Sequence, residues 1–430
     1  MKQLVVLVFA AGAWAQSLTL QQAVDLALKN NLQAQVAGER IAESRAQRGI
    51  GLSALLPQVS GAAYQMNLTE NLAAQGLTSA TFPGIPAFIG PFNRFDARFQ
   101  MAASLFNLAS IRGYQATRHG VQLAEVERRV ADQRVIAAAT LAYIGQLQAA
   151  ESVAAAQANV QLAQRLLDLA VNQRDAGIAT GLDVARAETR LAGQQVQLAQ
   201  ARTDLDTARL NLLRVTGLPL RSQLTLAETM RFDAQRTPGT DEAVRQALDG
   251  RQELQAASVQ VRIAKEEYQA AIAAYVPSVS AFGDYGSSGL KPNQVDLPTR
   301  SIGVRVDVPI FNGGRTRAEA QAAASRVRQA EMQLTDLRAA VEKDVRQALD
   351  NVATREEQMR ATQKNLDLAQ KELTLAQDRF QNGVADNIEV TNAQTALENA
   401  RQVNVASLAQ FNMARLNLYS ALGRAGSFTF

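Results

Sequence analysis

The chain has 430 residues, of which 44 are basic and 40 acidic, and it contains one histidine and no cysteine. The charges are interspersed without runs of one sign, which argues against nucleic-acid binding, because nucleic-acid-binding proteins concentrate basic residues on one face. Without cysteine or a second histidine, neither a zinc site nor a Cys–His catalytic pair is expected. We therefore predict that the chain is not an enzyme and holds no metal or cofactor.

The first residues are typical of an export signal. Lys2 precedes an apolar run from Leu4 to Ala11, and Ala13-Trp14-Ala15 fits a cleavage site of small residues. The run is too short to span a bilayer, so residues 1–15 are predicted to be a signal peptide cleaved before Gln16. The mature chain would then carry a net charge of about +3 instead of +4, and it has no apolar segment long enough for a transmembrane helix.

The mature chain consists of two copies of one unit. Gln22-Ala23-Val24 returns as Glu242-Ala243-Val244 at an offset of 220 residues, and Leu105-Phe106-Asn107 returns as Ile310-Phe311-Asn312 at an offset of 205. A unit this long is not a short solenoid repeat, so we interpret it as duplication of a whole structural half. The predicted boundaries are 16–217 for the first repeat, 218–240 for a linker, 241–423 for the second repeat and 424–430 for a C-terminal tail.

Each copy begins with a predicted helix. Thr19 and Gln22 have capping-box spacing, and the helix that begins there is expected to run to about Leu55. Proline cannot continue a helix, so Pro57 ends this one. The counterpart is expected from about Asp241 to Pro277.

Two strands follow in each copy. Apolar residues alternate with polar ones from Phe95 to Leu105 and from Ile302 to Ile310, which predicts strands with one apolar face. The four predicted strands cover about 58–68, 94–106, 278–286 and 301–311. Proline-containing segments between the strands are predicted to be exposed loops, and they include Pro292 and Pro298 in the second copy.

The longest helical patterns come next. No proline interrupts 110–177 or 315–382, which predicts two helices of about 68 residues, roughly 100 Å each. Return helices are predicted at about 182–216 and 388–422. Apolar, small and a few polar residues recur in them at a 3.5-residue period over ten positions from Val184 and from Val390, which predicts coiled-coil packing.

The strands cannot form a closed sheet within one chain. A membrane barrel needs about eight strands or more, and an open sheet would expose unpaired edges. Two chains would supply eight strands and three would supply twelve, and twelve leave a wider interior suited to conduction. The apolar face would then contact lipid, and the lumen would be lined by Asp96, Arg98, Arg305 and Asp307.

The duplicated order of elements resembles the TolC family of outer-membrane efflux channels. The residues that carry the resemblance are Leu18-Thr19-Leu20, Leu55-Leu56-Pro57 and the turn sequences Ala176–Val184 and Asn382–Val390. The resemblance implies a mainly α fold with a membrane β-barrel: a homotrimer with a twelve-stranded barrel in the outer membrane and a long α-helical periplasmic tunnel. It also implies a partly irregular equatorial belt at 218–240 and the C-terminal tail.

The same resemblance implies partners. They are a periplasmic adaptor (membrane fusion) protein, an inner-membrane transporter of the RND, ABC or MFS type, and outer-membrane lipid, with no nucleic acid. In the family the two helix turns meet the adaptor and close the inner entrance of the tunnel. Carried over by position, the adaptor contacts are Gly177, Ile178, Ala179, Thr180, Gly383 and Val384. A simpler interpretation also holds for the glycines, which end helices as C-caps.

A gate is implied just after the second turn. Family members usually place one or two aspartates there, and the corresponding positions are Glu389 and Asn392, with Asp386 in the turn before them. Three Glu389 carboxylates on a threefold axis would attract cations, and as like charges they would bind protons more readily. The alternative is that the helix dipole alone favours an acid in a first turn, as for Asp183 in the other copy.

The predicted function is a passive exit duct of a tripartite efflux pump or a type I secretion system. The first alternative is a periplasmic adaptor or another exported coiled-coil scaffold. Adaptors normally carry a single helical hairpin, so the doubled hairpin and the amphipathic strands favour the duct. The second alternative, an exported enzyme, lacks a catalytic constellation.

Overall fold

The computed structural model describes residues 17–430 except 235–237, 383 and 385–386, and it leaves out the side chains of 295–297 and 387. The chain divides into two units. The helical unit comprises Met1–Arg40, Glu125–Ala256 and Thr335–Phe430, and the sheet unit comprises Ile41–Ala124 and Ala257–Leu334. Four helices, α2, α3, α6 and α7, have residues in both units.

The first helix of each copy is interrupted, contrary to the prediction of one continuous helix. The observed helices are α1 Leu20–Asn30, α2 Leu32–Ser53, α5 Thr240–Gly250 and α6 Gln252–Ala273. The predicted capping box of Thr19 and Gln22 is present. At Asn31 the backbone turns to an extended conformation, and the side chain accepts a hydrogen bond from the Gln33 amide at 2.9 Å. Arg251 is extended in the same way between α5 and α6.

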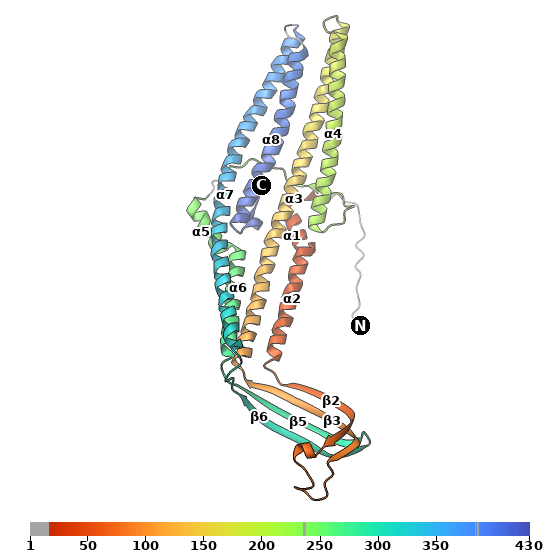
Figure 1. Cartoon of the computed structure of the whole chain (residues 1–430). Coiled ribbons are helices and arrows are strands. Elements are labelled where there is room, and N and C mark those ends of the chain that lie inside the picture. The colour runs from red at the N-terminus through yellow and green to blue at the C-terminus, as the bar shows by residue number, and fades with distance from the viewer. Residues whose placement is uncertain (1–16, 235–237, 383, 385–386) are drawn as a thin grey trace. The chain divides into compact units, whose positions relative to one another are not determined.

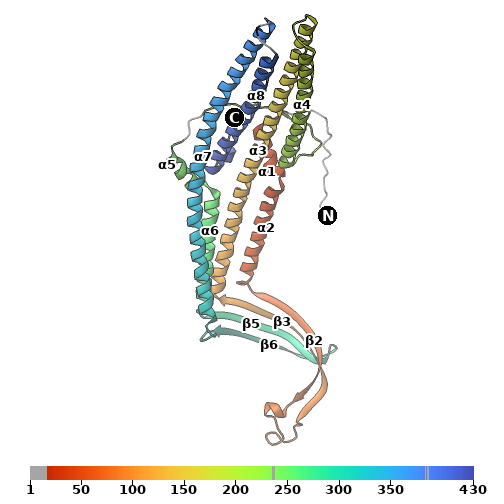
Figure 2. The same cartoon turned by 45° about the horizontal axis from the view of Figure 1, so that its top comes forward.

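Two long helical hairpins follow the pattern of the two copies. The first pairs α3 (Leu108–Asp175) with α4 (Gly181–Thr216), and the second pairs α7 (Arg315–Gln381) with α8 (Asn387–Ala421). In both views the members of each pair lie side by side (Figures 1 and 2). The α7–α8 seam buries small and large apolar residues in alternation: Ala369, Leu373, Ala376, Phe380, Val390, Ala393, Leu397 and Ala400. In the part of the chain that the structure describes, no helix is both long and apolar enough to cross a membrane.

The core of the helical unit forms where three short segments, β1 (Ser17–Leu18), β4 (Thr225–Leu226) and the C-terminal tail, pack against the long helices. The two short strands, β1 and β4, pair in parallel, which brings the predicted linker onto the first residues described. The Tyr143 hydroxyl donates to the Leu18 carbonyl at 2.9 Å, and burial raises the pKa of Tyr143. Phe428 and Phe430 of the C-terminal tail pack against each other at 5.5 Å between ring centroids. The linker and the tail therefore complete one core.

The strands of the two copies form a single antiparallel sheet in the sheet unit, in the order β2-β3-β5-β6. They are β2 Gln58–Asn71, β3 Phe88–Phe106, β5 Ser278–Lys291 and β6 Gln294–Asp307, and Figure 2 shows them as a curved layer. The copies join at β3 and β5, whose register sets Ser104 opposite Ser280. This leaves β2 and β6 as the edges of the sheet among the described residues. The four predicted strands are confirmed as β2, β3, β5 and β6, and the two-residue strands β1 and β4 were not predicted.

The strand ends differ from the prediction in several places, and two of these are that β2 ends at Asn71 rather than near residue 68 and β6 ends at Asp307 rather than near residue 311. β3 begins at Phe88 rather than near residue 94, and β5 and β6 meet at a tight turn instead of a long loop. Pro298, expected in that loop, lies within β6 opposite Ser287. A proline lacks a backbone donor, but it is tolerated on an edge strand, where one side of the backbone has no partner in the same chain.

Candidate functional site

The four predicted lumen residues share one face of the sheet. Cross-strand register places Asp96 and Arg98 of β3 on the same face as Arg305 and Asp307 of β6, because side chains alternate along each strand. Asp96 is almost fully buried, although its strand is otherwise well exposed on both faces. The sequence pattern thus predicted which side chains share a face.

Asp96 and Arg98 form a charge network that holds β3 to β5. Arg98 Nε lies 2.7 Å from Asp96 Oδ1, and Arg98 Nη1 lies 2.5 Å from Asp284 Oδ1. Ser288 donates to Asp96 Oδ2 at 2.8 Å. Farther along the same face, Arg305 lies over the Phe282 ring at 5.4 Å. Asp96, Arg98 and Asp284 each have an oppositely charged or polar partner, so this part of the face is hydrophilic.

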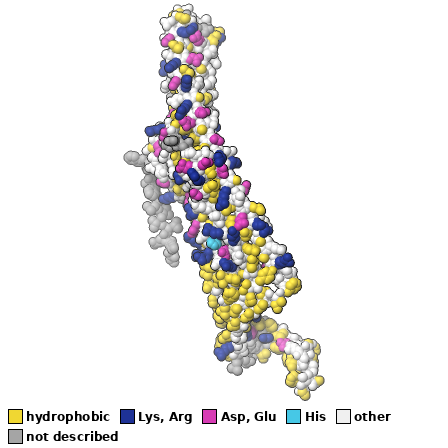
Figure 3. Space-filling view, turned by 90° about the vertical axis from the view of Figure 1, so that its left-hand side faces the viewer, with side chains coloured by type: hydrophobic (Ala, Val, Ile, Leu, Met, Phe, Trp, Pro, Cys, Tyr) yellow, Lys and Arg dark blue, Asp and Glu magenta, His cyan; other side chains and the backbone are white. Residues whose placement is uncertain are grey.

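The opposite face of the sheet is apolar and exposed. Phe99, Ile302 and Val304 lie on it, and Ile302 exposes 83% of its surface. Figure 3 shows this as a yellow surface over the strands. So large an exposed apolar surface is rare on a monomer in water and marks contact with a protein or a membrane.

The first helix turn, residues 176–180, is a well-formed cap. Gly177 has φ +78°, and the amides of Gly177 and Ile178 donate to the carbonyls of Arg174 and Gln173 at 2.9 and 2.8 Å. Thr180 and Asp183 form a reciprocal capping box. Both C-cap and N-cap therefore explain the sequence of this turn. Ile178 is exposed at this turn, as a contact residue would be. Its contact with an adaptor stays a prediction.

The second helix turn, residues 382–386, is described only in part. Gly383 and Asp386, which we predicted as a contact and a gate residue, lie outside the described residues. Val384 donates to the Arg379 carbonyl at 2.9 Å and exposes its side chain, as does Ile388 at the start of α8. Both turns of the helical unit thus present apolar side chains to solvent.

The other two predicted gate residues, Glu389 and Asn392, lie in the first two turns of α8. Glu389 is half-buried, and its Oε1 lies 3.2 Å from Nε of Arg379, in the last turn of α7. Asn392 is exposed. Within one chain Glu389 therefore contacts a cation across the helix turn rather than another carboxylate, and its convergence with other copies stays a prediction.

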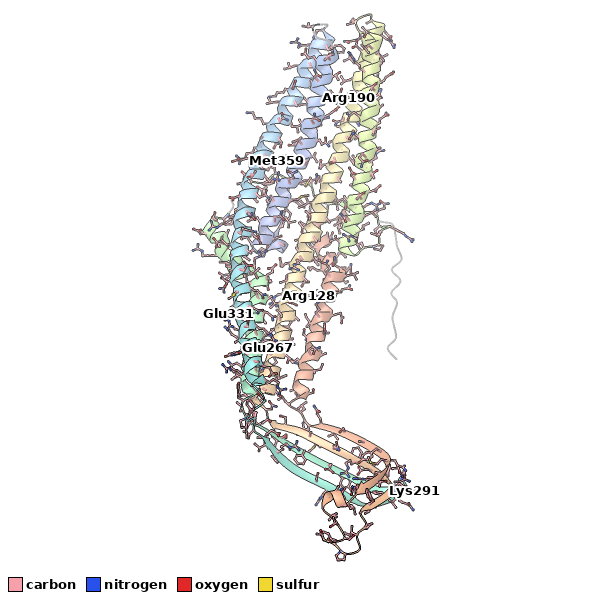
Figure 4. All side chains as sticks on the ribbon, in the orientation of Figure 1. Arg128, Arg190, Glu267, Lys291, Glu331 and Met359 are labelled. Atoms are coloured by element: carbon pink, nitrogen blue, oxygen red, sulfur yellow. The ribbon has the colours of Figure 1, made fainter. Side chains whose placement is uncertain are left out.

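A buried polar cluster, which was not predicted from the sequence, links α4 to α8. Glu398 accepts hydrogen bonds from Arg190, from Gln194 Nε2 at 3.0 Å and from Gln394 Nε2 at 2.9 Å. Arg190, labelled in Figure 4, also donates to Thr395 at 3.0 Å. Burial raises the pKa of Glu398, and the Arg190 charge only partly opposes this effect. A carboxylate so placed joins the two copies about three helical turns from the tips of their hairpins.

One signal of this cluster was visible in the sequence. Gln194 is a polar residue at a seam position where the preceding and following members, Leu191 and Leu198, are apolar. A polar residue at such a position commonly specifies the pairing of helices. Its partner could not be identified, because Glu398 lies 204 residues away in the other copy.

The only histidine takes part in no metal site. His119 Nδ1 lies 3.0 Å from Gln122 Oε1, one turn further along α3. Among the described residues no group of three or more His, Asp or Glu side chains could hold a metal ion.

Comparisons with known proteins identify the family. The sequence pattern of the family described as "Outer membrane efflux protein" matches residues 23–218 and 243–424. The pyoverdine export outer membrane protein OpmQ of Pseudomonas aeruginosa is 27% identical over 72% of this chain, and the chain spans 65% of that protein's length. The alkaline protease secretion protein AprF of the same species is 25% identical over 95% of this chain and 85% of its own length.

A solved structure agrees with the fold. The CmeC outer membrane channel of Campylobacter jejuni superposes with a TM-score of 0.80 at 18% identity, over 94% of this chain and 86% of that one. The predicted resemblance to outer-membrane efflux channels is confirmed, and none of these proteins supports the adaptor alternative. Because the family pattern covers most of both repeats, the chain belongs to the outer membrane efflux protein family.

Proposed function

We propose that three copies of this chain form an exit duct for a tripartite efflux pump or a type I secretion system. Twelve strands close a barrel in the outer membrane, and the long helices form the periplasmic tunnel. The observation that carries the proposal is the four-stranded sheet with one apolar face and two edge strands, β2 and β6, that have no further partner strand among the described residues.

Lipid and backbone chemistry together favour this assembly. In a membrane each unsatisfied backbone group costs several kcal/mol, so a sheet with open edges is excluded there. Joining β6 of one chain to β2 of the next satisfies both edges at once. Eight strands leave an interior filled by side chains, whereas twelve leave room for a conducting lumen. The charged face of Asp96, Arg98 and Arg305 suits a water-filled interior.

The helix turns are proposed to receive the periplasmic adaptor, which connects the duct to an inner-membrane transporter of the RND, ABC or MFS type. The exposed side chains of Ile178 and Val384 support this role. The other proposed contacts are Gly177, Ala179, Thr180 and Gly383. The gate is proposed at Glu389 and Asn392, with Asp386 beside them. Residues 1–15 serve as the signal peptide for export.

The named relatives carry different cargoes. One is named for pyoverdine export and another for alkaline protease secretion. We propose that the cognate transporter selects the cargo, while the duct itself is passive and hydrolyses nothing.

Disulfide trapping tests the assembly directly, because the chain contains no cysteine that could interfere. One cysteine at Ser60 of β2 is combined in turn with one at each position from Arg300 to Val306 of β6. Oxidation in detergent should give covalent dimers and trimers at one register. The matched control S104C/S280C, which joins directly paired residues of β3 and β5, should give only an intramolecular bond. A mature chain that stays monomeric without detergent, and that forms no intermolecular bond, would overturn the proposal.

A further inference from the structure

A basic cavity opens in the sheet unit between α2, α3 and α6. Its volume is about 420 Å³, within the range of small-molecule sites. The charged residues that line it are Arg48, Arg112, Arg118 and Glu266, and His119 contributes an imidazole. Three guanidinium groups face one carboxylate, so the cavity has an excess of positive charge.

The arginines differ in what they contact. Arg112 Nη1 donates to Gln115 Oε1 at 2.9 Å and lies 3.3 Å from Glu266 Oε2, so it is held in place by its own unit. Arg48 and Arg118 are exposed, and neither has a hydrogen-bond or ion-pair partner among the residues that the structure describes. Two guanidinium groups at one cavity are thus available to an anion, and their planar forks fit phosphate oxygens.

The cavity lies next to the apolar face of the sheet. In Figure 3 the cyan side chain, the only histidine of the chain, lies among dark-blue Arg and Lys side chains, and a yellow hydrophobic surface begins just below it. Phe106, the last residue of β3, pairs with Val279 on that face and is 43% exposed. Arg112 lies four residues after Leu108, the first residue of α3, which is about 6 Å of helix, and Arg48 lies five residues before Ser53, the last residue of α2, which is about 8 Å.

The depths of Arg48 and Arg112 match a lipid headgroup, and Arg118 lines the same cavity from about two turns farther along α3. The interfacial layer extends roughly 5–8 Å beyond the hydrocarbon on each side of a bilayer, and long arginine side chains bridge a few ångströms more. Basic pockets at this level bind the headgroups of anionic lipids. An acyl chain attached to a phosphate in the cavity would extend over the exposed apolar strand residues.

We propose that this cavity binds the phosphodiester headgroup of an anionic phospholipid in the periplasmic leaflet of the outer membrane. Arg48 and Arg118 contact the phosphate, and Arg112 is held beside them by Glu266. The inference rests on the proposed membrane position of the sheet. It adds a lipid site between the barrel and the helices.

Lipid titration of the purified, delipidated assembly in nonionic detergent tests the site. Dioleoyl-phosphatidylglycerol, the zwitterionic dioleoyl-phosphatidylcholine and inorganic phosphate are added separately, and bound lipid is counted by native mass spectrometry. The test variant is R48Q/R118Q, which removes the two arginines without intramolecular partners and leaves the Arg112–Glu266 pair in place. The control variant is R326Q/R328Q, which removes two exposed arginines about three turns into α7, a depth along the helix similar to that of Arg118.

The expected result is tight binding of phosphatidylglycerol to wild type and control, and weaker binding of phosphatidylcholine. R48Q/R118Q should bind phosphatidylglycerol about 25-fold more weakly, because each arginine near an anionic headgroup contributes about fivefold in affinity. Equal affinity in R48Q/R118Q and wild type would overturn the proposal. If inorganic phosphate bound as tightly as phosphatidylglycerol, the ligand would be free phosphate and the proposal of a lipid site would be wrong. If the protein is a detergent-dependent trimer that does not bind phosphatidylglycerol, only the lipid site is contradicted. If it is a monomer that is stable without detergent, the proposed function is contradicted as well.

Discussion

Removal of the Glu398 carboxylate tests whether the buried cluster holds α4 to α8. In Glu398→Ala, the donors of Arg190, Gln194 and Gln394 lose their shared acceptor. Loss of one partner of a fully buried ion pair costs about 3–5 kcal/mol. The Arg190 side chain is 30% exposed and regains some hydration, so we expect a loss of about 3 kcal/mol in the free energy of unfolding.

Two further variants separate the charge from the contact. Glu398→Gln keeps an acceptor oxygen and removes a charge that burial disfavours, so we expect it to cost about 1 kcal/mol. R190M/E398M replaces both partners by apolar groups of similar length and should be close to neutral. Because the double variant is close to neutral, the coupling energy from the double-mutant cycle should equal the summed losses of the single variants R190M and E398M, which is about 3 kcal/mol or more.

Guanidinium unfolding followed by the helical circular dichroism signal measures these differences. All variants are compared at one protein concentration, because the stability of an oligomer depends on concentration. The exposed pair Arg346–Glu342 within α7 is the matched control, and its removal should cost less than about 0.5 kcal/mol. If the coupling between Arg190 and Glu398 were no larger than that of the control pair, the cluster would not join the two copies.

The pH dependence gives a second test of the same residue. Burial raises the pKa of Glu398 above its ordinary value of 4.5, so the folded state holds the proton more tightly than the unfolded state does. The contribution of this carboxyl is therefore fully present below pH 4.5 and is lost as the pH rises through the raised value. The stability of Glu398→Gln relative to wild type should improve over that range. An unchanged or opposite trend would mean that the Arg190 charge outweighs burial.

Four further variants test the two faces of the sheet, a turn and the gate. Ile302→Arg, on the apolar face, should destabilise the membrane-embedded assembly by about 2–4 kcal/mol, which would be seen as loss of SDS-resistant trimer. Arg305→Gln, on the other face, should keep the trimer and change ion selectivity in planar bilayers. Equal loss of trimer in both variants would contradict the assignment of faces. Gly177→Ala places a Cβ at φ +78° and should cost about 1 kcal/mol in thermal unfolding experiments, and an unchanged transition would show that the turn relaxes. Glu389→Gln should lower cation selectivity in planar bilayers, and unchanged selectivity and calcium block would count against a carboxylate gate.

Local periodicity predicted much of the fold. The alternation around Asp96 and Arg98 gave the two faces of β3, because the side-chain period of a strand is a property of the backbone itself. The 3.5-residue spacing from Val390 to Ala400 gave the buried seam of α8, which the structure confirms. Both signals lie within one element and depend on no contact elsewhere in the chain.

Features that depend on distant contacts could not be predicted in this way. The helix break at Asn31 is stabilised by a hydrogen bond from its side chain to the Val215 carbonyl, 184 residues away. Nothing in the local sequence forbids a helix there, since asparagine is only a moderate helix former. The partner of Glu389 was equally hidden, because Arg379 lies across a turn whose geometry the sequence does not specify.

The cluster at Glu398 also shows how the two copies have diverged. At the offset of 206 residues that relates Leu212 to Leu418, Arg190 corresponds to Ala396 and Glu398 to Ala192. Each copy therefore carries one charge where the other carries alanine, and the charges meet only when α4 of the first copy faces α8 of the second. The first hairpin carries only Arg190 of this pair and the second carries only Glu398. Two copies of the same hairpin therefore cannot form the contact. The buried ion pair thus favours a fixed pairing of unlike hairpins, at a small cost in stability, as polar residues do at coiled-coil seams.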